Sequence, residues 1–471
     1  MNSVTRFGSV DMRGLLGTCA IVLAFIVGMS ATPVLLHAST MRTDTIPDCH
    51  VGAYRLADGS FVDVAPAVGD TLRWRRFDGT TGALARGSDG KWVSSYGWTD
   101  RPDHIRVEWP DCARGVIRFG GVHGERIPFD VTETRFESHG TTLVGRLVLP
   151  KQRRPGTDAD RVPIVVLVHG AEWISARTFY SLQRMLPSEG VGAFVYDKRG
   201  TGASGGTYTQ DFDLLADDAV AAMKEARRIA GARAGRVGYQ GGSQGGWVAP
   251  IAAGRAPVDF VIVSFGLAVS VIDEDQEEAA LEMKLKGHGP EEIAKGLEVA
   301  SAAEAVFESG FTKGFERLDS LRSKYEHEPW YKDVHGNYTY MILPLSSQDM
   351  KARAAELRVN GTPFRYDPMP TITALSVPQL WVLGGNDLET PSGETSRLLE
   401  GLIAQDHPIT LAIYPTAEHG MTEFEQGPNG ERISTRYSTG YFAMMRDFAR
   451  AGQLGKSYGD AVITRPRGRH D

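Results

Sequence analysis

Residues 236–251 constrain the fold more than any other stretch, and they read Arg-Val-Gly-Tyr-Gln-Gly-Gly-Ser-Gln-Gly-Gly-Trp-Val-Ala-Pro-Ile. A short run of β-type residues ends at Gly241, and an apolar segment that can form a helix follows Gly245. A serine between these glycines predicts a very tight strand-to-helix turn, because only glycine lets strand and helix pass so closely. Such a turn exposes the Ser243 hydroxyl at the helix N-terminus, where the helix dipole favours negative charge.

The same G-x-S-x-G spacing occurs a second time at Gly202-Ala203-Ser204-Gly205-Gly206, so the pattern alone does not select a serine. This match follows the strand-like run 194–197, but no helix-forming segment comes directly behind it. We therefore interpret Ser204 as part of a mobile glycine loop and Ser243 as the candidate nucleophile.

Composition limits the classes of function. A chain of 471 residues with 42% hydrophobic residues is long enough for two or three domains. Its net charge is −7 and its lysines and arginines are scattered, so no basic surface for nucleic acid is expected.

The N-terminus predicts export. Residues 14–36 carry no charge and follow Arg6 and Arg13, as in a secretory signal peptide within residues 1–39. Neither possible cleavage site is a clean Ala-x-Ala, and the segment is long enough to span a bilayer, so an uncleaved anchor is the alternative. In both cases the positive flank places the rest outside the cytoplasm, secreted or periplasmic, with membrane contact only through this anchor.

The chain has three cysteines, and removal of a signal peptide would discard Cys19. Cys49 and Cys112 remain, and in an oxidising compartment we expect them to form a disulfide; two buried thiols are the alternative. No CxxC, HExxH or similar ligand spacing is present in the sequence, so we expect no metal.

Residues 45–132 contain short alternating runs separated by Asp-Gly turns at 58–59, 78–79 and 89–90. This spacing predicts a small antiparallel β domain. We find no catalytic constellation in it and expect a packing or shielding module, with a module that binds substrate or a surface as the alternative.

From residue 133 to 455 strands and helices alternate. The expected strands are 142–150, 163–168, 191–196, 237–240, 260–265, 379–383 and 409–414, with a helix at 213–229 between the third and fourth. Repeated β-α units predict a doubly wound, mostly parallel sheet, whose sites lie at the carboxyl ends of its strands. Residues 456–471 are expected to be a tail, disordered from Arg465 onward.

Charged helical patterns interrupt this alternation between residues 271 and 370, and we expect a helical lid over the site there. Most of its aromatic residues should form the core of the lid: Phe307, Phe311, Phe315, Trp330, Tyr331, Tyr338 and Tyr340.

A serine nucleophile needs a base and a third group that orients the base. Asp387 follows the strand 379–383, and His419 follows the last core strand, 409–414. The order Ser243, Asp387, His419 predicts a catalytic triad at the sheet's carboxyl edge.

Alternatives remain for each partner. Asp387 could only cap the helix after Pro391, Glu389 is a nearby competitor, and Glu418 could be the acid beside His419. His419 is one of 12 histidines.

An oxyanion hole needs two backbone N–H groups, one of them from the residue after the nucleophile. We assign these to Gln244 and Ala171, with Glu172 as the runner-up for the second. His169 is expected to support this loop structurally.

Taken together, these residues resemble the serine hydrolases of the α/β-hydrolase superfamily, and within it secreted bacterial esterases of the EstD type, related to the prolyl-oligopeptidase and serine-aminopeptidase groups. The resemblance covers about residues 135–450. It rests on the motifs Leu143-Val144-Gly145-Arg146-Leu147, Val168-His169-Gly170, Tyr196-Asp197-Lys198-Arg199-Gly200-Thr201-Gly202-Ala203-Ser204, Gly241-Gly242-Ser243-Gln244-Gly245-Gly246-Trp247, Asp387 to Pro391 and Glu418-His419-Gly420.

The resemblance implies ester hydrolysis through an acyl-enzyme, without a cofactor. The chain departs from it at Ala171-Glu172-Trp173, where related enzymes often have small residues. A carboxylate and an indole there could shape the acyl pocket or disfavour anionic substrates.

We therefore predict a carboxylesterase that acts on a small-molecule ester. The first alternative is a peptidase for short peptides or aminoacyl amides, with acids such as Glu274 and Glu277 holding the substrate's free amine. The second is a binding protein without catalysis that uses the β domain.

Overall fold

The structure is a computed structural model that describes residues 48–467, except residues 68, 88–89, 153–160 and 358–359. The expected signal peptide or anchor, residues 1–39, lies outside the described residues. Within the described part of the chain, no helix combines the length and the apolar character needed to cross a membrane.

The N-terminal segment is a closed antiparallel barrel, which confirms the predicted β domain. After the short helix η1 (Asp48–His50), its strands are β1 (Gly52–Leu56), β2 (Phe61–Pro66), β3 (Leu72–Arg75), β4 (Thr81–Arg86), β5 (Trp92–Tyr96), β6 (Pro102–Asp111), β7 (Val116–Phe119) and β8 (Val122–Arg126). Each strand pairs with the next, and β1 closes the barrel by pairing with β8. Buried side chains such as Tyr54, Trp74 and Phe119 fill its interior.

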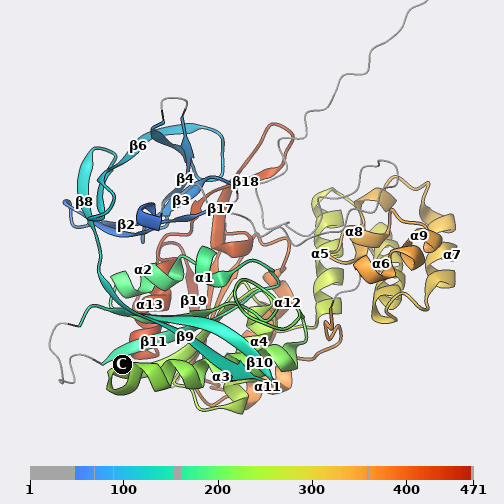
Figure 1. The fold of residues 1–471 in the computed structure, drawn as a ribbon. Coiled ribbons are helices and arrows are strands. Elements are labelled where there is room, and N and C mark those ends of the chain that lie inside the picture. The colour runs from blue at the N-terminus through green and yellow to red at the C-terminus, as the bar shows by residue number, and fades with distance from the viewer. Residues whose placement is uncertain (1–47, 68, 88–89, 153–160, 358–359, 468–471) are drawn as a thin grey trace, which may run out of the picture.

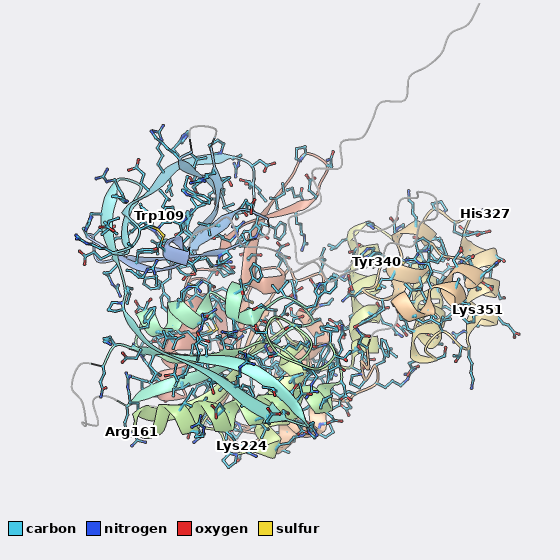
Figure 2. The ribbon with its side chains drawn as sticks, viewed as in Figure 1. Trp109, Arg161, Lys224, His327, Tyr340 and Lys351 are labelled. Atoms are coloured by element: carbon cyan, nitrogen blue, oxygen red, sulfur yellow. A yellow bond between two sulfur atoms is a disulfide. The ribbon has the colours of Figure 1, made fainter. Side chains whose placement is uncertain are left out.

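The predicted disulfide between Cys49 and Cys112 is present, with the two Cα atoms 5.3 Å apart. It joins η1 to the end of β6, and Figure 2 shows it beside Trp109. The bond fixes the start of the described chain to the barrel.

The second unit is a nine-stranded sheet in the order β19-β16-β15-β14-β13-β11-β12-β10-β9. Its strands are β9 (Phe129–Ser138), β10 (Thr141–Pro150), β11 (Val162–Val168), β12 (Gly192–Tyr196), β13 (Ala234–Gly242), β14 (Val261–Ser264), β15 (Gln379–Gly384), β16 (Ile409–Tyr414) and β19 (Val462–Thr464). Strands β11 to β16 are parallel, and the hairpin β9–β10 forms an antiparallel edge. The predicted doubly wound, mostly parallel sheet is thus confirmed.

Helices cover both faces of this sheet (Figure 1). The helices α1 (Ala176–Phe179), α2 (Leu182–Ser188) and α13 (Tyr441–Ala451) share one buried core with the sheet, and α3 (Phe212–Ala230), α4 (Gly245–Arg255), α11 (Met369–Ala374) and α12 (Ser392–Ile403) share the other. A short helix η3 (Gly231–Arg233) follows α3. The strands β11 to β16 are mostly buried because helices pack on both sides of them.

The expected tail needs a correction. Residues 462–464 form β19, which pairs antiparallel with β16 at the edge of the sheet. Val462 and Ile463 are β-branched residues beside an open strand edge, and pairing satisfies backbone groups that a free tail would leave to water.

The interruption between β14 and β15 is helical, as predicted. It contains α5 (Val271–Leu285), α6 (Pro290–Glu308), α7 (Phe315–Tyr325), η4 (Tyr331–Asp333), α8 (Thr339–Ile342), α9 (Ser347–Ala352) and α10 (Ala354–Leu357). Phe307, Phe311, Phe315 and Trp330 are buried in a core of its own. Figure 1 shows α5 nearest to the sheet, with α6, α7, α8 and α9 farther out.

A hairpin that we did not predict follows η5 (His419–Met421). Its strands, β17 (Thr422–Gln426) and β18 (Arg432–Tyr437), contact the barrel. The backbone N–H of Trp98 donates to Ser434 O at 2.9 Å, and that of Tyr437 donates to Gly79 O at 2.9 Å. The barrel therefore packs against the segment directly after His419.

Candidate active site

The tight turn predicted at Ser243 joins β13 to α4. Ser243 has φ 52°, a left-handed conformation that costs a non-glycine residue about 1 kcal/mol or more. A Cβ on Gly241 would lie 2.1 Å from Gly245 O, and one on Gly245 would lie 2.9 Å from His169 O. These approaches explain why both flanking positions are glycine and confirm the predicted turn.

Asp387 and His419 meet at the carboxyl ends of β15 and β16. His419 Nδ1 lies 3.1 Å from Asp387 Oδ2, and both side chains are largely buried. Thr390 holds the carboxylate in place, because its N–H donates to Oδ1 at 2.8 Å and its hydroxyl donates to Oδ2 at 2.7 Å. Asp387 contacts Thr390 and His419 rather than the first turn of α12, so it does not act as that helix's cap.

Neither of the two competing acids, Glu418 and Glu389, contacts His419 Nδ1. Glu418 is buried and accepts hydrogen bonds from Ser434 Oγ at 2.6 Å and Thr422 Oγ1 at 3.4 Å, so it faces the hairpin. Glu389 does reach the imidazole, but on its other nitrogen: its Oε1 lies 3.6 Å from His419 Nε2. Of these three acids, only Asp387 contacts Nδ1, the nitrogen that an orienting carboxylate must hold.

Gly242, the residue before Ser243, and His419 share Phe265 as a neighbour. The Phe265 ring centroid lies 4.9 Å from that of His419, and a Cβ on Gly242 would lie 2.6 Å from the same ring. Among the described residues, no hydrogen bond joins the Ser243 hydroxyl to His419. Such bonds are often long until a substrate is bound.

Several acidic side chains gather around the predicted site. Burial lowers the pKa of His419, but the carboxylates of Glu389, Asp387 and Glu278 outweigh this and raise it to about 9. Burial raises the pKa of Glu274 well above its usual value, and Glu278 and Glu389 raise it further. Because Glu274 and Glu278 belong to α5, this helix of the insertion lies within electrostatic reach of the predicted triad.

The predicted oxyanion donors are available. Within the described part of the chain, neither the N–H of Ala171 nor that of Gln244 donates a hydrogen bond. Gln244 is the N-cap residue of α4, so its N–H has no acceptor inside the helix.

Sequence reasoning missed Lys198, which lies between the two segments that carry these donors. Its Nζ donates to Gly170 O at 3.0 Å and to Gln244 Oε1 at 2.9 Å, and only 1% of the residue is exposed. Burial lowers the pKa of Lys198 to about 8, although Glu172 opposes this. The signal was present in the sequence, because Lys198 follows the end of strand β12 at the same sheet edge.

The loop after β11 is held by specific contacts. His169 is buried and bonds through Nε2 to Tyr196 O, which fits the expected supporting role. Glu172 accepts a short hydrogen bond from the Tyr180 hydroxyl, whereas Trp173 is 64% exposed. The Glu172 carboxylate is therefore bound to Tyr180.

The second G-x-S-x-G serine has a different environment. The Ser204 hydroxyl donates to Asp197 O at 2.7 Å and accepts from Val144 N at 2.9 Å. These bonds tie the loop that we interpreted as mobile to strand β10 and to the residue after β12. Because both roles of the hydroxyl are occupied, Ser204 is not placed to act as a nucleophile.

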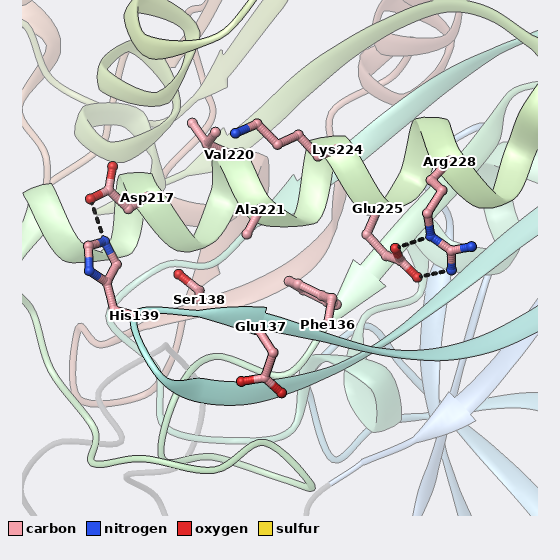
Figure 3. Close-up of a pocket in the computed structure, with 10 residues that line it drawn as sticks. All are labelled: Phe136, Glu137, Ser138, His139, Asp217, Val220, Ala221, Lys224, Glu225 and Arg228. Atoms are coloured by element: carbon pink, nitrogen blue, oxygen red, sulfur yellow. Dashed lines mark hydrogen bonds and ion pairs between the residues drawn. The ribbon is translucent and has the colours of Figure 1, made fainter.

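A depression of about 510 Å³ lies between the β9–β10 turn and α3, away from these residues (Figure 3). Four of its side chains form two pairs: His139 Nε2 lies 2.7 Å from Asp217 Oδ2, and Glu225 accepts hydrogen bonds from Arg228. None of the predicted site residues lines it.

In the described residues, two groups of side chains have metal-ligating spacing. Cys49, His50 and Cys112 form the first, but both cysteines are in the disulfide. Glu278, Glu282 and His335 form the second, in the helical insertion.

The fold and the turn at Ser243 define a serine hydrolase of the α/β-hydrolase class. The model of the family described as serine aminopeptidase, S33, matches residues 159–427, more than half of the 471 residues. The chain belongs to this family. No curated protein matches it.

Solved structures of similar fold include an esterase from Pyrococcus furiosus, with 16% identity, a TM-score of 0.37, and coverage of 62% of this chain and 84% of that one. An acylaminoacyl peptidase from Pyrococcus horikoshii has 13% identity and a TM-score of 0.40, and covers 84% of this chain and 57% of that one.

Proposed function

We propose that the protein hydrolyses carboxylic esters of small molecules through an acyl-enzyme on Ser243. The observation that carries this proposal is the 3.1 Å contact between His419 Nδ1 and Asp387 Oδ2 at the sheet edge where the strained turn presents Ser243. In this mechanism His419 Nε2 takes the proton of the Ser243 hydroxyl as the oxygen attacks the ester carbonyl. His419 then returns the proton to the leaving alcohol, and the same steps with water release the acid.

The developing oxyanion would be held by the N–H groups of Ala171 and Gln244. Lys198 holds the Gly170 carbonyl, and a planar trans peptide directs the Ala171 N–H to the opposite side. The lysine also fixes the Gln244 side chain. Lys198 is therefore a positioning residue for both donors.

We also propose that α5 serves as the inner face of a lid. Two pKa shifts support this proposal. Glu278 raises the pKa of His419, and Asp387 and Glu389 raise the pKa of Glu274. The barrel has a packing role in this proposal, since it contacts the hairpin behind His419. The disulfide supports export of the chain, because such bonds persist in oxidising compartments.

The test is hydrolysis of a p-nitrophenyl acyl series by the protein without residues 1–39. Ser243→Ala should abolish turnover, and the matched control Ser204→Ala should keep it at temperatures where both variants are folded. Equal turnover by Ser243→Ala and the wild type would reject the nucleophile.

A second candidate is an aminopeptidase, and a specific observation favours it. Glu274, Glu278 and Glu389 lie within electrostatic reach of one another or of His419, and burial raises the pKa of all three. A substrate's free ammonium group would favour their ionised forms and pair with them. Aminoacyl p-nitroanilides would then be cleaved, while their N-acetylated forms would not. Glu274→Gln should raise KM only for the free-amine substrates. A wild type inert toward esters and anilides would favour the remaining alternative, a binding protein that uses the barrel.

A further inference from the structure

A group of side chains in the helical insertion is unused by the proposed reaction. Glu278 and Glu282 are four residues apart on α5, so they lie on one face of the helix. His335, from the segment between η4 and α8, faces them: its Nδ1 lies 3.7 Å from Glu278 Oε1 and 3.4 Å from Glu282 Oε1. One ligand atom from each residue lies within 4.8 Å of the others.

Two polar atoms in this group have no hydrogen-bond partner among the described residues. They are Glu278 Oε2 and His335 Nδ1, and both are shielded from solvent. Glu278 is only 6% exposed, and leaving a polar atom of such a group unpaired costs about 1–3 kcal/mol. A partner that binds the Glu278 carboxylate would remove this cost.

We propose that Glu278, Glu282 and His335 bind a divalent transition-metal ion of the zinc type. Two carboxylates and an imidazole are ligands for Zn²⁺, and they leave a fourth position open. Ligand atoms about 2.0–2.1 Å from a tetrahedral ion are separated by roughly 3.3 Å. The contacts of His335 Nδ1 at 3.7 and 3.4 Å are close to this separation. The two positive charges of the ion would balance the two carboxylates, and the imidazole would bind in its neutral form.

Neighbouring groups already fix the ligands in place. Lys286 Nζ lies 3.5 Å from Glu282 Oε2, so it holds one oxygen of that carboxylate while Oε1 faces His335. The imidazole stacks on Tyr340, labelled in Figure 2, with the ring centroids 4.4 Å apart and the planes at 17°. Outer contacts of this kind orient the ligands of metal sites. They also distinguish this group from an exposed cluster of acids.

Bound metal would fasten α5 to the segment that precedes α8. Glu278 also raises the pKa of His419, so the ion would neutralise one of the negative charges that produce this shift. This group was not predictable from local sequence, because two ligands lie on α5 and the third more than 50 residues later. We had expected no metal from the absence of a compact ligand motif.

The test is calorimetric titration of the tag-free, chelator-treated protein with ZnCl₂, followed by Co²⁺ absorption spectroscopy. We expect one saturable site per chain and a Co²⁺ spectrum with nitrogen and oxygen ligands. His335→Ala and, separately, Glu282→Gln should each weaken binding at least about tenfold. Melting curves without metal identify any variant that fails to fold, and Glu282→Gln is the milder change.

The matched control is His288→Ala. His288 belongs to the same insertion and also lies between two carboxylates, 3.3 Å from Glu292 and 2.9 Å from Asp333. This variant should bind Zn²⁺ like the wild type. Absence of saturable binding, or equal affinity in folded His335→Ala and wild type, would overturn the proposal and leave an ion-pair cluster. Neither readout depends on the proposed hydrolysis.

Discussion

Glu389 offers a direct test of how charge controls the proposed base. Its Oε1 lies 3.6 Å from His419 Nε2, and together with Asp387 and Glu278 it raises the pKa of the imidazole to about 9 despite the opposing effect of burial. With this pKa, His419 is largely protonated at pH 7, and a protonated imidazole cannot accept the serine proton. Glu389→Gln removes one negative charge and keeps the shape of the side chain.

The size of the effect follows from the distance. Two unit charges at this separation interact by about 1 kcal/mol in bulk water and about 4–5 kcal/mol at an effective dielectric constant of 20. The Glu389 side chain is 37% exposed, so solvent screening places the interaction toward the lower limit. We expect the pKa of His419 to fall by roughly 1 unit, since about 1.4 kcal/mol corresponds to one unit.

The assay is the pH dependence of kcat/KM with a neutral p-nitrophenyl ester, because its acid limb reports the free enzyme's base. Lowering the pKa increases the neutral fraction below it, so the limb should move to lower pH. Activity at pH 7 should then rise several-fold, up to about tenfold. Glu394→Gln is the control, since that carboxylate pairs with Arg397 on the outside of α12. An acid limb that stays in place or moves to higher pH would refute the reasoning.

Three further predictions test the surroundings of the site. Lys198→Met should lower kcat by roughly 10- to 100-fold with little change in KM. This is less than the loss of about 10²- to 10³-fold that follows removal of one oxyanion donor. An unchanged kcat would exclude the positioning role. Gly97→Ala should destabilise the protein more than Gly59→Ala in a melting assay. A Cβ at position 97 would lie 2.4 Å from Thr435 O, whereas a Cβ at position 59 would have no neighbour within 4 Å. Equal losses of stability would mean that only the positive φ matters. Replacing Cys49 and Cys112 by serine should cost about 2–5 kcal/mol in denaturant unfolding, and reducing agent should then affect only the wild type.

Much of the site was predictable because strand ends of a parallel sheet meet at one edge. Asp387 and His419 were selected from their places after the strands 379–383 and 409–414, and the structure brings them into contact. The turn at Ser243 was predictable from local sterics, since the approach of Gly241 to Gly245 tolerates no side chain.

Other features depend on contacts between distant segments. The place of Lys198 after β12 puts it at the sheet edge, but only the folded chain shows that its ammonium group reaches Gly170 and Gln244. The hairpin β17–β18 was missed because its pairing is interrupted by a bulge and its stability comes partly from the barrel. The edge strand β19 was predicted to be part of a tail, because its partner β16 lies about 50 residues earlier in the chain.

The sequence by itself determined the local and periodic features: buried strands, amphipathic helices, the strained serine turn and the pair of cysteines. These follow from the chain's own steric limits and from the burial that each short stretch requires. Only the tertiary structure decided which charges share a buried space. It placed Glu389 beside His419, two acids of α5 within electrostatic reach of the triad residues, and His335 near Glu278 and Glu282. Electrostatic interactions depend on distance and burial in space, and neither quantity can be read from separation along the chain.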